Sequence, residues 1–208
     1  MNEGTPFHAI YFDFKAAFDK FDHELLLTEI SKTGIHRRTV EWCADYLANR
    51  SFRVRVSDCL SAPWMAPSGV PQGSFLSPLL FSINVLDLQR FIPSSVRYLS
   101  LADDLKIYGP ARSESDHLAP QSAVDGIFTW CTLNQMSLSP SECAVSATNG
   151  MDPLSPRYHA GGESLPFVGS VRDLGVTVSG DLDFSSIVNC IFRCFVVKTP
   201  GFYMRLLI

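Results

Sequence analysis

The sequence lacks the features that mark several large classes of protein. Its six cysteines form no C-x-x-C pair and no histidine pair stands at zinc-finger spacing, so the pattern favours buried or idle thiols over metal ligands. The main apolar run, residues 75–86, is too short to span a bilayer and contains Pro78. The first residues show no signal-peptide pattern. These absences predict a soluble intracellular protein.

Charged residues are also scarce, at 18% of the chain, and the formal net charge is −4. A dedicated nucleic-acid-binding module normally carries a basic patch or stripe, so that class is disfavoured. A catalytic core that holds divalent metal must itself concentrate carboxylates, so the charge leaves this class open. The chain has 208 residues, of which 46% are hydrophobic. This length and hydrophobic content are enough for one domain with a core, with or without an appendage.

Hydrophobic periodicity and turn residues predict a mixed series of elements. Strands are expected at residues 9–14, 51–57 (with one wet face), 96–101, 105–108, 143–147 and 172–178. Helices are expected at 23–32, 37–48, 79–91, 114–136 and 185–197, with a loop at 62–78 and a linker at 148–162. Asp22 should cap the first helix, and Pro120 should lie near an end or a kink. The order lacks regular βαβ alternation, which favours an α+β fold of antiparallel strands with helices on one face.

Three acidic residues stand in apolar, strand-like surroundings. Asp13 lies within the run Ile-Tyr-Phe-Asp-Phe, and Asp103 and Asp104 lie at the tip of an expected hairpin. A buried charge is costly unless it is partnered, so acids in such surroundings need an explanation. Mg²⁺ prefers carboxylate oxygens, and two ions about 3.5–4 Å apart assist phosphoryl transfer. Taken alone, the adjacent pair fits a polar turn at least as well as a metal site.

Several blocks in a fixed order resemble the reverse transcriptases of non-LTR (LINE-type) retrotransposons. The segment FDFKAAFDKFDH at residues 12–23 resembles their motif A, and GVPQGSFLSPLLF at residues 69–81 looks like motif B. LADD at residues 101–104 is similar to motif C, with Leu101 where the family usually has an aromatic residue. Residues 130–143 resemble the motif D region, and residues 172–176 resemble the segment that follows it.

The resemblance implies the fold and the site. The fold would be a polymerase palm, an α+β antiparallel sheet with helices packed on one face. Asp13, Asp103 and Asp104 match the catalytic aspartates that coordinate two Mg²⁺ ions, for which Mn²⁺ can substitute. Four further positions match residues that contact the incoming nucleotide or the template: Phe14 through its backbone, the aromatic gate Phe18, Gln72 and Gly73.

The residues by themselves leave alternatives open. Phe18 also fits a core aromatic, Gln72 a side chain that satisfies its own loop, and Gly73 a turn. Arg53 and Arg55, on an alternating strand, fit a contact with a nucleic-acid backbone and a solvated face equally well.

The implied activity is RNA-directed DNA polymerisation, the transfer of nucleotides from deoxynucleoside triphosphates to the 3′-OH of a DNA primer on an RNA template. No membrane partner is expected. Such elements copy themselves at chromosomal DNA, so a nuclear location is expected, although no basic cluster reads as a nuclear address. The alternative is a catalytically inactive, truncated remnant with at most weak binding of metal or nucleic acid.

The chain departs from the family pattern at one position of chemical importance. Glu142 stands where motif D has a lysine proposed to act as an acid toward pyrophosphate, and a carboxylate supplies no positive charge. Residues 1–150 would form the palm, and residues 151–208 a linker, a strand segment and a C-terminal helix leading toward a thumb. The fingers strands that normally precede motif A, and the thumb itself, are expected to be absent.

Overall fold

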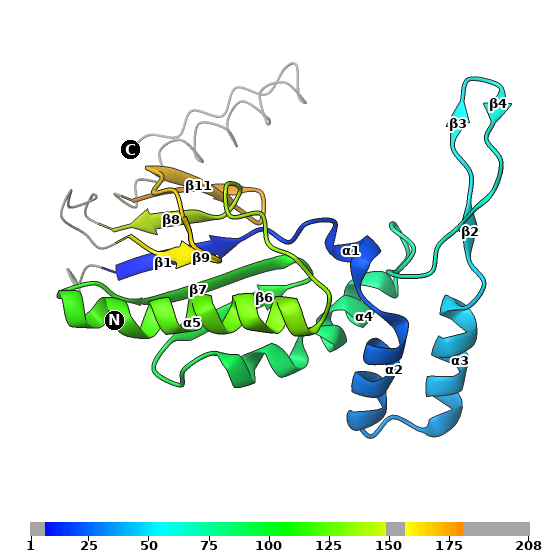
Figure 1. Cartoon of the computed structure of the whole chain (residues 1–208), viewed down its shortest axis with the longest axis horizontal. Helices are drawn as coiled ribbons and strands as arrows, with labels where there is room; N and C mark the ends of the chain where they lie inside the picture. Colours follow the sequence, from blue (N-terminus) through cyan, green and yellow to red (C-terminus); the bar gives the residue numbers. More distant parts are fainter. Residues whose placement is uncertain (1–6, 149–156, 181–208) are drawn as a thin grey trace, which may run out of the picture.

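A four-stranded antiparallel sheet forms the centre of the molecule, in the order β6-β7-β1-β8 (Figure 1). The structure is a computed structural model, and it describes residues 7–148 and 157–180. The strands are β1 (Phe7–Phe12), β6 (Arg97–Leu101), β7 (Asp104–Pro110) and β8 (Ala144–Ala147). The hairpin expected around the acidic pair is therefore confirmed as β6–β7.

Strand alternation divides the sheet into a core face and an open face. In β1, Ile10 and Phe12 are buried, whereas Tyr11 between them is only half-buried. In β7, Leu105 and Ile107 likewise point into the core, with Lys106 on the opposite side. Side chains that follow the same alternation beyond the strand ends are thereby assigned to one face or the other.

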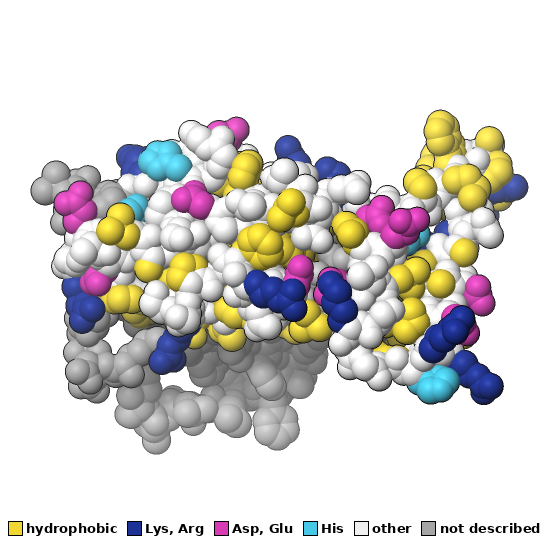
Figure 2. Space-filling model, turned by 60° about the horizontal axis from the view of Figure 1, so that its bottom comes forward, with side chains coloured by type: hydrophobic (Ala, Val, Ile, Leu, Met, Phe, Trp, Pro, Cys, Tyr) yellow, Lys and Arg dark blue, Asp and Glu magenta, His cyan; other side chains and the backbone are white. Residues whose placement is uncertain are grey.

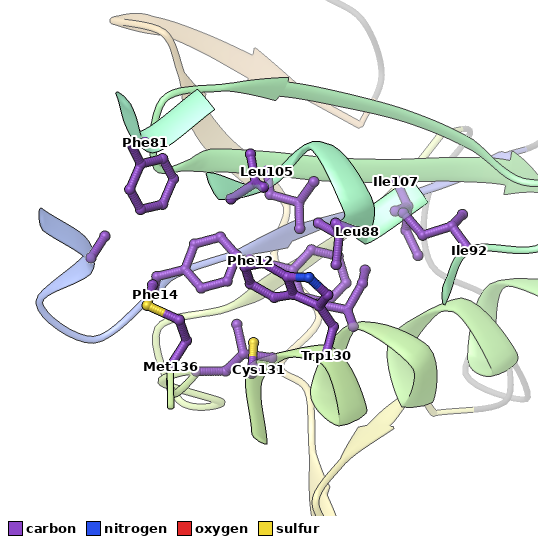
Figure 3. Packing of buried hydrophobic residues seen from close by; sticks show 14 of the residues in the cluster. Phe12, Phe14, Phe81, Leu88, Ile92, Leu105, Ile107, Trp130, Cys131 and Met136 are labelled. Atoms are coloured by element: carbon purple, nitrogen blue, oxygen red, sulfur yellow. The ribbon is translucent and has the colours of Figure 1, made fainter. Parts of the chain in front are cut away.

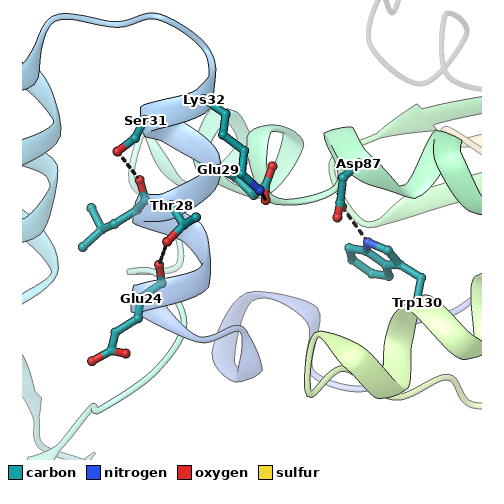
Figure 4. Close-up of polar contacts among 8 residues, drawn as sticks. Glu24, Thr28, Glu29, Ser31, Lys32, Asp87 and Trp130 are labelled. Carbon is teal, nitrogen blue, oxygen red and sulfur yellow. Dashed lines mark hydrogen bonds and ion pairs between the residues drawn. The ribbon is translucent and has the colours of Figure 1, made fainter.

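Helices cover the core face. They are α4 (Ser77–Asn84), the 3₁₀ helix η1 (Leu86–Phe91) and α5 (Glu114–Leu133), and Figure 3 shows their packing against the sheet. Trp130 of α5 is fully buried, and its indole Nε1–H donates to Asp87 Oδ1 at 2.6 Å (Figure 4). Gly126 lets α5 approach η1, because a Cβ there would lie 2.0 Å from the carbonyl oxygen of Phe91. The single helix predicted for residues 79–91 is thus two elements that meet at Val85.

A second group of helices begins within motif A: α1 (Ala17–Lys20), α2 (His23–Lys32) and α3 (Arg37–Leu47). The cap expected at Asp22 is confirmed, since its Oδ1 accepts from Glu24 N–H at 2.7 Å and Leu25 N–H at 3.1 Å. On the surface of α2, side-chain hydroxyls bond to carbonyls one turn earlier and Lys32 pairs with Glu29 (Figure 4). Leu26 and Ile30 form the buried face of α2.

A thin two-stranded ribbon projects beyond α3 (Figure 1). It consists of β2 (Ser51–Phe52), β3 (Arg55–Val56), β4 (Cys59–Leu60) and β5 (Trp64–Met65), with β2 paired to β5 and β3 to β4. The sequence predicted one strand here with one wet face, but both faces are exposed and hydrophobic side chains gather on the ribbon (Figure 2). Alternation gives a strand two chemically different faces, but a face is buried only where a neighbouring element packs against it.

The end of the described chain forms two small hairpins. One pairs β9 (His159–Ala160) with β10 (Glu163–Ser164), and the other pairs β11 (Ser170–Asp173) with β12 (Val176–Ser179). The linker expected at 148–162 is, from residue 157 onward, part of the core, because Tyr158 and Ala160 are buried in the same cluster as Ile10. The strand expected at 172–178 is the β11–β12 hairpin. The helix expected at 185–197 lies outside the described residues, and the domain boundary at residue 150 stays a prediction.

None of the helices that the structure describes combines the length and the apolar character needed to cross a membrane. Pro120 lies within α5 rather than at its end, and its ring packs over Gly109 of β7, where a Cβ would be 3.2 Å from the Pro120 Cγ. Cys43, Cys131 and Cys143 are free and buried, whereas Cys59 is free and exposed on the ribbon.

A cluster of aromatic and imidazole rings joins β1, α5 and the 157–167 segment, away from the acidic residues. His8 Nδ1 hydrogen-bonds the Tyr158 hydroxyl at 3.0 Å, and the His117 ring lies 4.0 Å from the Tyr158 ring between centroids. Burial lowers the pKa of His8, and the nearby His117 lowers it further. Burial also lowers the pKa of His117, opposed by a hydrogen bond with the backbone of Arg157.

These depressed pKa values predict acid sensitivity. Below the ordinary histidine pKa of 6.5, the unfolded chain takes up protons that the folded chain excludes, so the free energy of unfolding should fall as the pH drops through that value. Urea denaturation at several pH values measures this slope, and His117→Phe should flatten it. Equal slopes in His117→Phe and the parent chain would contradict the assignment.

Candidate active site

The register of the sheet brings the acidic residues together. β1 pairs Phe12 with Leu105 of β7 and Tyr11 with Ala144 of β8. Extending both pairings past the end of β1 puts Asp13 opposite Asp104 on one side and opposite Glu142 on the other. A slip of one residue would turn Asp13 to the other face, so the site depends on this register.

Asp13 is the first residue after β1, and its main chain is held on both sides. Its N–H donates to Cys143 Sγ at 3.4 Å, and its carbonyl accepts from the Ser139 N–H at 2.9 Å. The apolar sequence around it suggested a buried acid, but the residue is exposed at the strand end. The flanking Phe12 and Phe14 point into the core, so alternation directs Asp13 outward.

Asp103 and Asp104 occupy the tip of the β6–β7 hairpin. Leu101 pairs with Asp104, which leaves Ala102 and Asp103 as the turn. Ala102 has φ 52°, in the left-handed region that costs a residue with a Cβ about 1–2 kcal/mol. The turn is therefore tight and presents two consecutive acids at one point.

Neighbouring carboxyl groups contribute to the raised pKa of Asp13. The pKa of Asp13 is raised by partial burial, by a hydrogen bond with Glu142, and by the charges of Glu142, Asp103 and Asp104. A hydrogen bond between two carboxyl groups requires a proton on one of them. Glu142 is thus placed directly beside Asp13, which sequence reasoning had noted only as a missing lysine.

Asp104 shares in the same concentration of charge. Burial raises the pKa of Asp104, as do the charges of Asp103 and Asp173, and Lys106 opposes them. Lys106 forms an ion pair with Asp173 of β11, and both side chains are largely shielded from solvent. Its Nζ also lies 5.8 Å from the centre of the Tyr11 ring. This pair fastens the β11–β12 hairpin over the open face of the sheet.

Two cavities lie beside the turn that carries Asp103 and Asp104. The first, of about 280 Å³, lies under the β11–β12 hairpin, and Asp13, Asp104, Glu142, Lys106 and Asp173 contribute its charged groups together with Arg172. The second, of about 550 Å³, is lined by Phe14, Ala16, Ala17, Phe18, Gln72, Gly73, Ser74, Ser77, Pro78 and Asp103. The residues predicted to contact the nucleotide therefore share one cavity with Asp103, and Asp13 and Asp104 line the other.

Three of the four residues predicted to contact the nucleotide or template, Phe14, Phe18 and Gln72, also make contacts within the protein. The Phe14 ring is buried, edge-on to Phe81 at 6.2 Å between centroids, and the Phe18 ring lies 5.3 Å from Phe81. Gln72 Nε2 donates to both carboxylate oxygens of Asp19, at 3.2 and 3.3 Å. Each of these side chains thus has a packing or loop-holding role while lining the cavity, and their roles toward a nucleotide stay predictions.

The motif B loop is fastened to motif A through main-chain groups. Gly69 N–H donates to the Phe21 carbonyl at 2.9 Å, and Val70 N–H donates to the Phe18 carbonyl at 2.7 Å. Gly69 has φ 68°, and a Cβ there would lie 2.2 Å from the Phe18 oxygen. Only glycine permits this approach. The position of Phe18 in the cavity therefore depends on Gly69.

Two side chains that sequence reasoning missed complete this fastening. Arg50 Nη2 donates to the carbonyls of Gly69 at 2.6 Å and Ser68 at 2.9 Å, and His23 Nε2 hydrogen-bonds the same Gly69 carbonyl at 2.8 Å. Nothing in the local sequence marks Arg50, because its partners lie in a loop almost twenty residues further along the chain. His23 ends the motif A block, and the sequence alone suggests no role for it.

The acidic residues have the right chemistry for a hard cation but not a closed geometry. Carboxylate oxygens are the ligands that Mg²⁺ prefers. Within residues 7–148 and 157–180, however, no group of three or more His, Cys, Asp or Glu side chains is placed to hold a metal ion. The residue types therefore suit a divalent ion, but their arrangement in the described residues does not form a metal site.

Comparison with known proteins identifies the family. The family "Reverse transcriptase (RNA-dependent DNA polymerase)" matches residues 2–178. The chain is 26% identical over 194 residues to the "Probable RNA-directed DNA polymerase from transposon BS" of Drosophila melanogaster, covering 85% of this chain and 20% of that protein. It is 25% identical over 193 residues to the "RNA-directed DNA polymerase from mobile element jockey" of Drosophila funebris, covering 89% of this chain and 21% of that protein. The chain thus spans about a fifth of these relatives.

Solved structures show the same fold at low sequence identity. Telomerase from Candida tropicalis, in complex with a TWJ fragment of telomeric RNA, superposes with a TM-score of 0.59 at 12% identity, over 89% of this chain and 31% of that one. The antiparallel sheet with helices on one face is therefore a polymerase palm, as predicted. With the family match over most of its length, the chain belongs to the reverse transcriptases, as a domain of the LINE type carried by non-LTR retrotransposons.

Proposed function

We propose that this palm catalyses RNA-directed DNA polymerisation, extending the 3′-OH of a DNA primer on an RNA template with deoxynucleoside triphosphates. One observation carries the proposal: Phe14, Phe18, Gln72 and Gly73 line a single cavity together with Asp103. That cavity is large enough for the base and sugar of a nucleotide and opens at the acidic turn.

Each group has a role that follows from its position. Asp13, Asp103 and Asp104 would hold two Mg²⁺ ions, or Mn²⁺ in their place, and the ions supply charge stabilisation for the transferring phosphoryl group. Phe18 lines the cavity, where its ring would exclude a ribose 2′-OH. Gln72 and Gly73 would contact the base or the template, and the backbone at Phe14 would contact the triphosphate.

The template is proposed to be RNA. The similar Drosophila proteins are named RNA-directed DNA polymerases, and the similar telomerase structure contains an RNA fragment. A nuclear location is also proposed, because retrotransposons of this type copy themselves at chromosomal DNA.

Primer extension on poly-rA/oligo-dT tests the proposal. Asp103→Asn should lower the rate by about 100-fold or more, because it removes one carboxylate from the metal-binding acids. Asp45→Asn makes the same chemical change at an exposed position of α3 and should leave the rate unchanged. A folded chain that incorporates no nucleotide in Mg²⁺ or Mn²⁺ is instead an inactive remnant, and full activity in Asp103→Asn would also refute the site.

Glu142 provides a second test. Glu142→Lys removes the carboxyl that bonds to and repels Asp13 and adds a cation where the family uses one as an acid. The rate of single-nucleotide incorporation should rise, by roughly tenfold or more if the lysine acts as a general acid.

Glu142→Gln is the matched control, because it removes the negative charge without adding a positive one. A smaller gain in Glu142→Gln than in Glu142→Lys isolates the cation. Identical rates in the two variants would show that only the loss of the carboxylate matters, and a lower rate in both would mean that Glu142 itself assists the reaction.

A further inference from the structure

Phe75 is the most exposed large hydrophobic side chain in the described part of the chain, with a relative exposure of 102%. It lies in the motif B loop, directly after residues that line the 550 Å³ cavity. Exposing an entire aromatic ring forfeits the favourable transfer of its surface from water. A ring held in this way at the edge of a site is suited to a partner that covers it.

The loop on either side of Phe75 is fixed. The Ser74 hydroxyl hydrogen-bonds the Tyr46 hydroxyl at 2.6 Å and accepts from the Leu76 N–H at 3.2 Å. The Ser77 hydroxyl, which is buried, donates to the Pro71 carbonyl at 2.5 Å. The outward position of the ring is thus set by hydrogen bonds immediately before and after it.

The ring lies outside the cavity although its neighbours line it. Gly73, Ser74, Ser77 and Pro78 all border the cavity, whereas Phe75 does not. A nucleotide in the cavity needs a template base as its pairing partner, so the strand that carries this base has to pass along the edge of the cavity. An aromatic face at this position matches an unpaired base, because stacking between a base and an aromatic side chain tolerates any sequence.

We propose that Phe75 is a stacking residue for an unpaired base of the template strand, next to the nucleotide that occupies the cavity. The inference rests on the proposed polymerase function and adds to it a positioning residue for the template. Phe75 acts on the strand ahead of the primer end and does not touch the reacting groups.

The test compares two nucleic-acid probes. One is an RNA template annealed to a DNA primer with an unpaired 5′ template overhang, and the other is a blunt duplex of the same paired length. Binding is followed by fluorescence anisotropy of a label on the primer. Phe75→Ala should weaken binding of the overhang probe by roughly tenfold, within the range of one base–aromatic stack, and leave binding of the blunt probe unchanged.

Three controls separate stacking from other effects. Phe75→Trp should retain binding, and its indole fluorescence should be quenched by the overhang probe alone. Leu118→Ala removes another exposed apolar side chain, from α5, that lines neither cavity, and should change neither affinity. The melting temperature of Phe75→Ala should equal that of the parent chain, because the fully exposed ring loses no contacts.

The outcomes are distinguishable. The stacking role is overturned if Phe75→Ala binds both probes equally more weakly, or if it binds the overhang probe as tightly as the parent chain does. The proposed function still stands in either case, provided that the parent chain binds the probes and extends the primer. A parent chain that binds neither probe contradicts the proposed function and removes the basis for the stacking role. Weakening confined to the overhang probe supports it.

Discussion

The pairing of β1 with both β7 and β8 is the constraint on which the site depends. It fixes which face of the sheet each side chain occupies, and it places the residue after β1 between the ends of two neighbouring strands. The core face contributes the energy that holds this register, through Ile10, Phe12 and the helices packed on them (Figure 3). Apolar packing on one side of the sheet thus determines the arrangement of charges on the other.

The carboxyl groups in this arrangement repel one another when they are ionised. Asp13, Asp104 and Glu142 border one cavity, and the pKa values of Asp13 and Asp104 are raised first by burial and then by neighbouring carboxylates. Lys106 is the basic residue that lowers the pKa of Asp104, but it also forms an ion pair with Asp173. The proposed divalent ions would offset these negative charges.

Local sequence signals predicted the parts of the fold that depend on local structure. The cap at Asp22, the strand before Asp13 and the turn at Ala102 all lie where short-range patterns place them. Contacts distant in sequence were beyond those patterns, such as Arg50 reaching the Gly69 carbonyl, or Tyr158 entering the core from an apparent linker. Phe14, Phe18, Gln72 and Gly73, which the motif order singled out, line one cavity with Asp103, whereas Asp13 and Asp104 line another. The motif order gave no sign that Glu142 would lie beside Asp13.

The β2–β5 ribbon makes the behaviour of the chain in solution depend on salt in two opposing ways. Phe52, Val54 and Trp64 are more than half exposed on a ribbon that also carries Arg53 and Arg55. Added salt screens the charges of these arginines and of Asp58, which lies 4.0 Å from Arg55, and leaves the apolar surfaces free to associate. The nucleic-acid binding proposed for the chain would weaken with the same addition. Dilute protein at low salt is therefore the condition best suited to testing that binding.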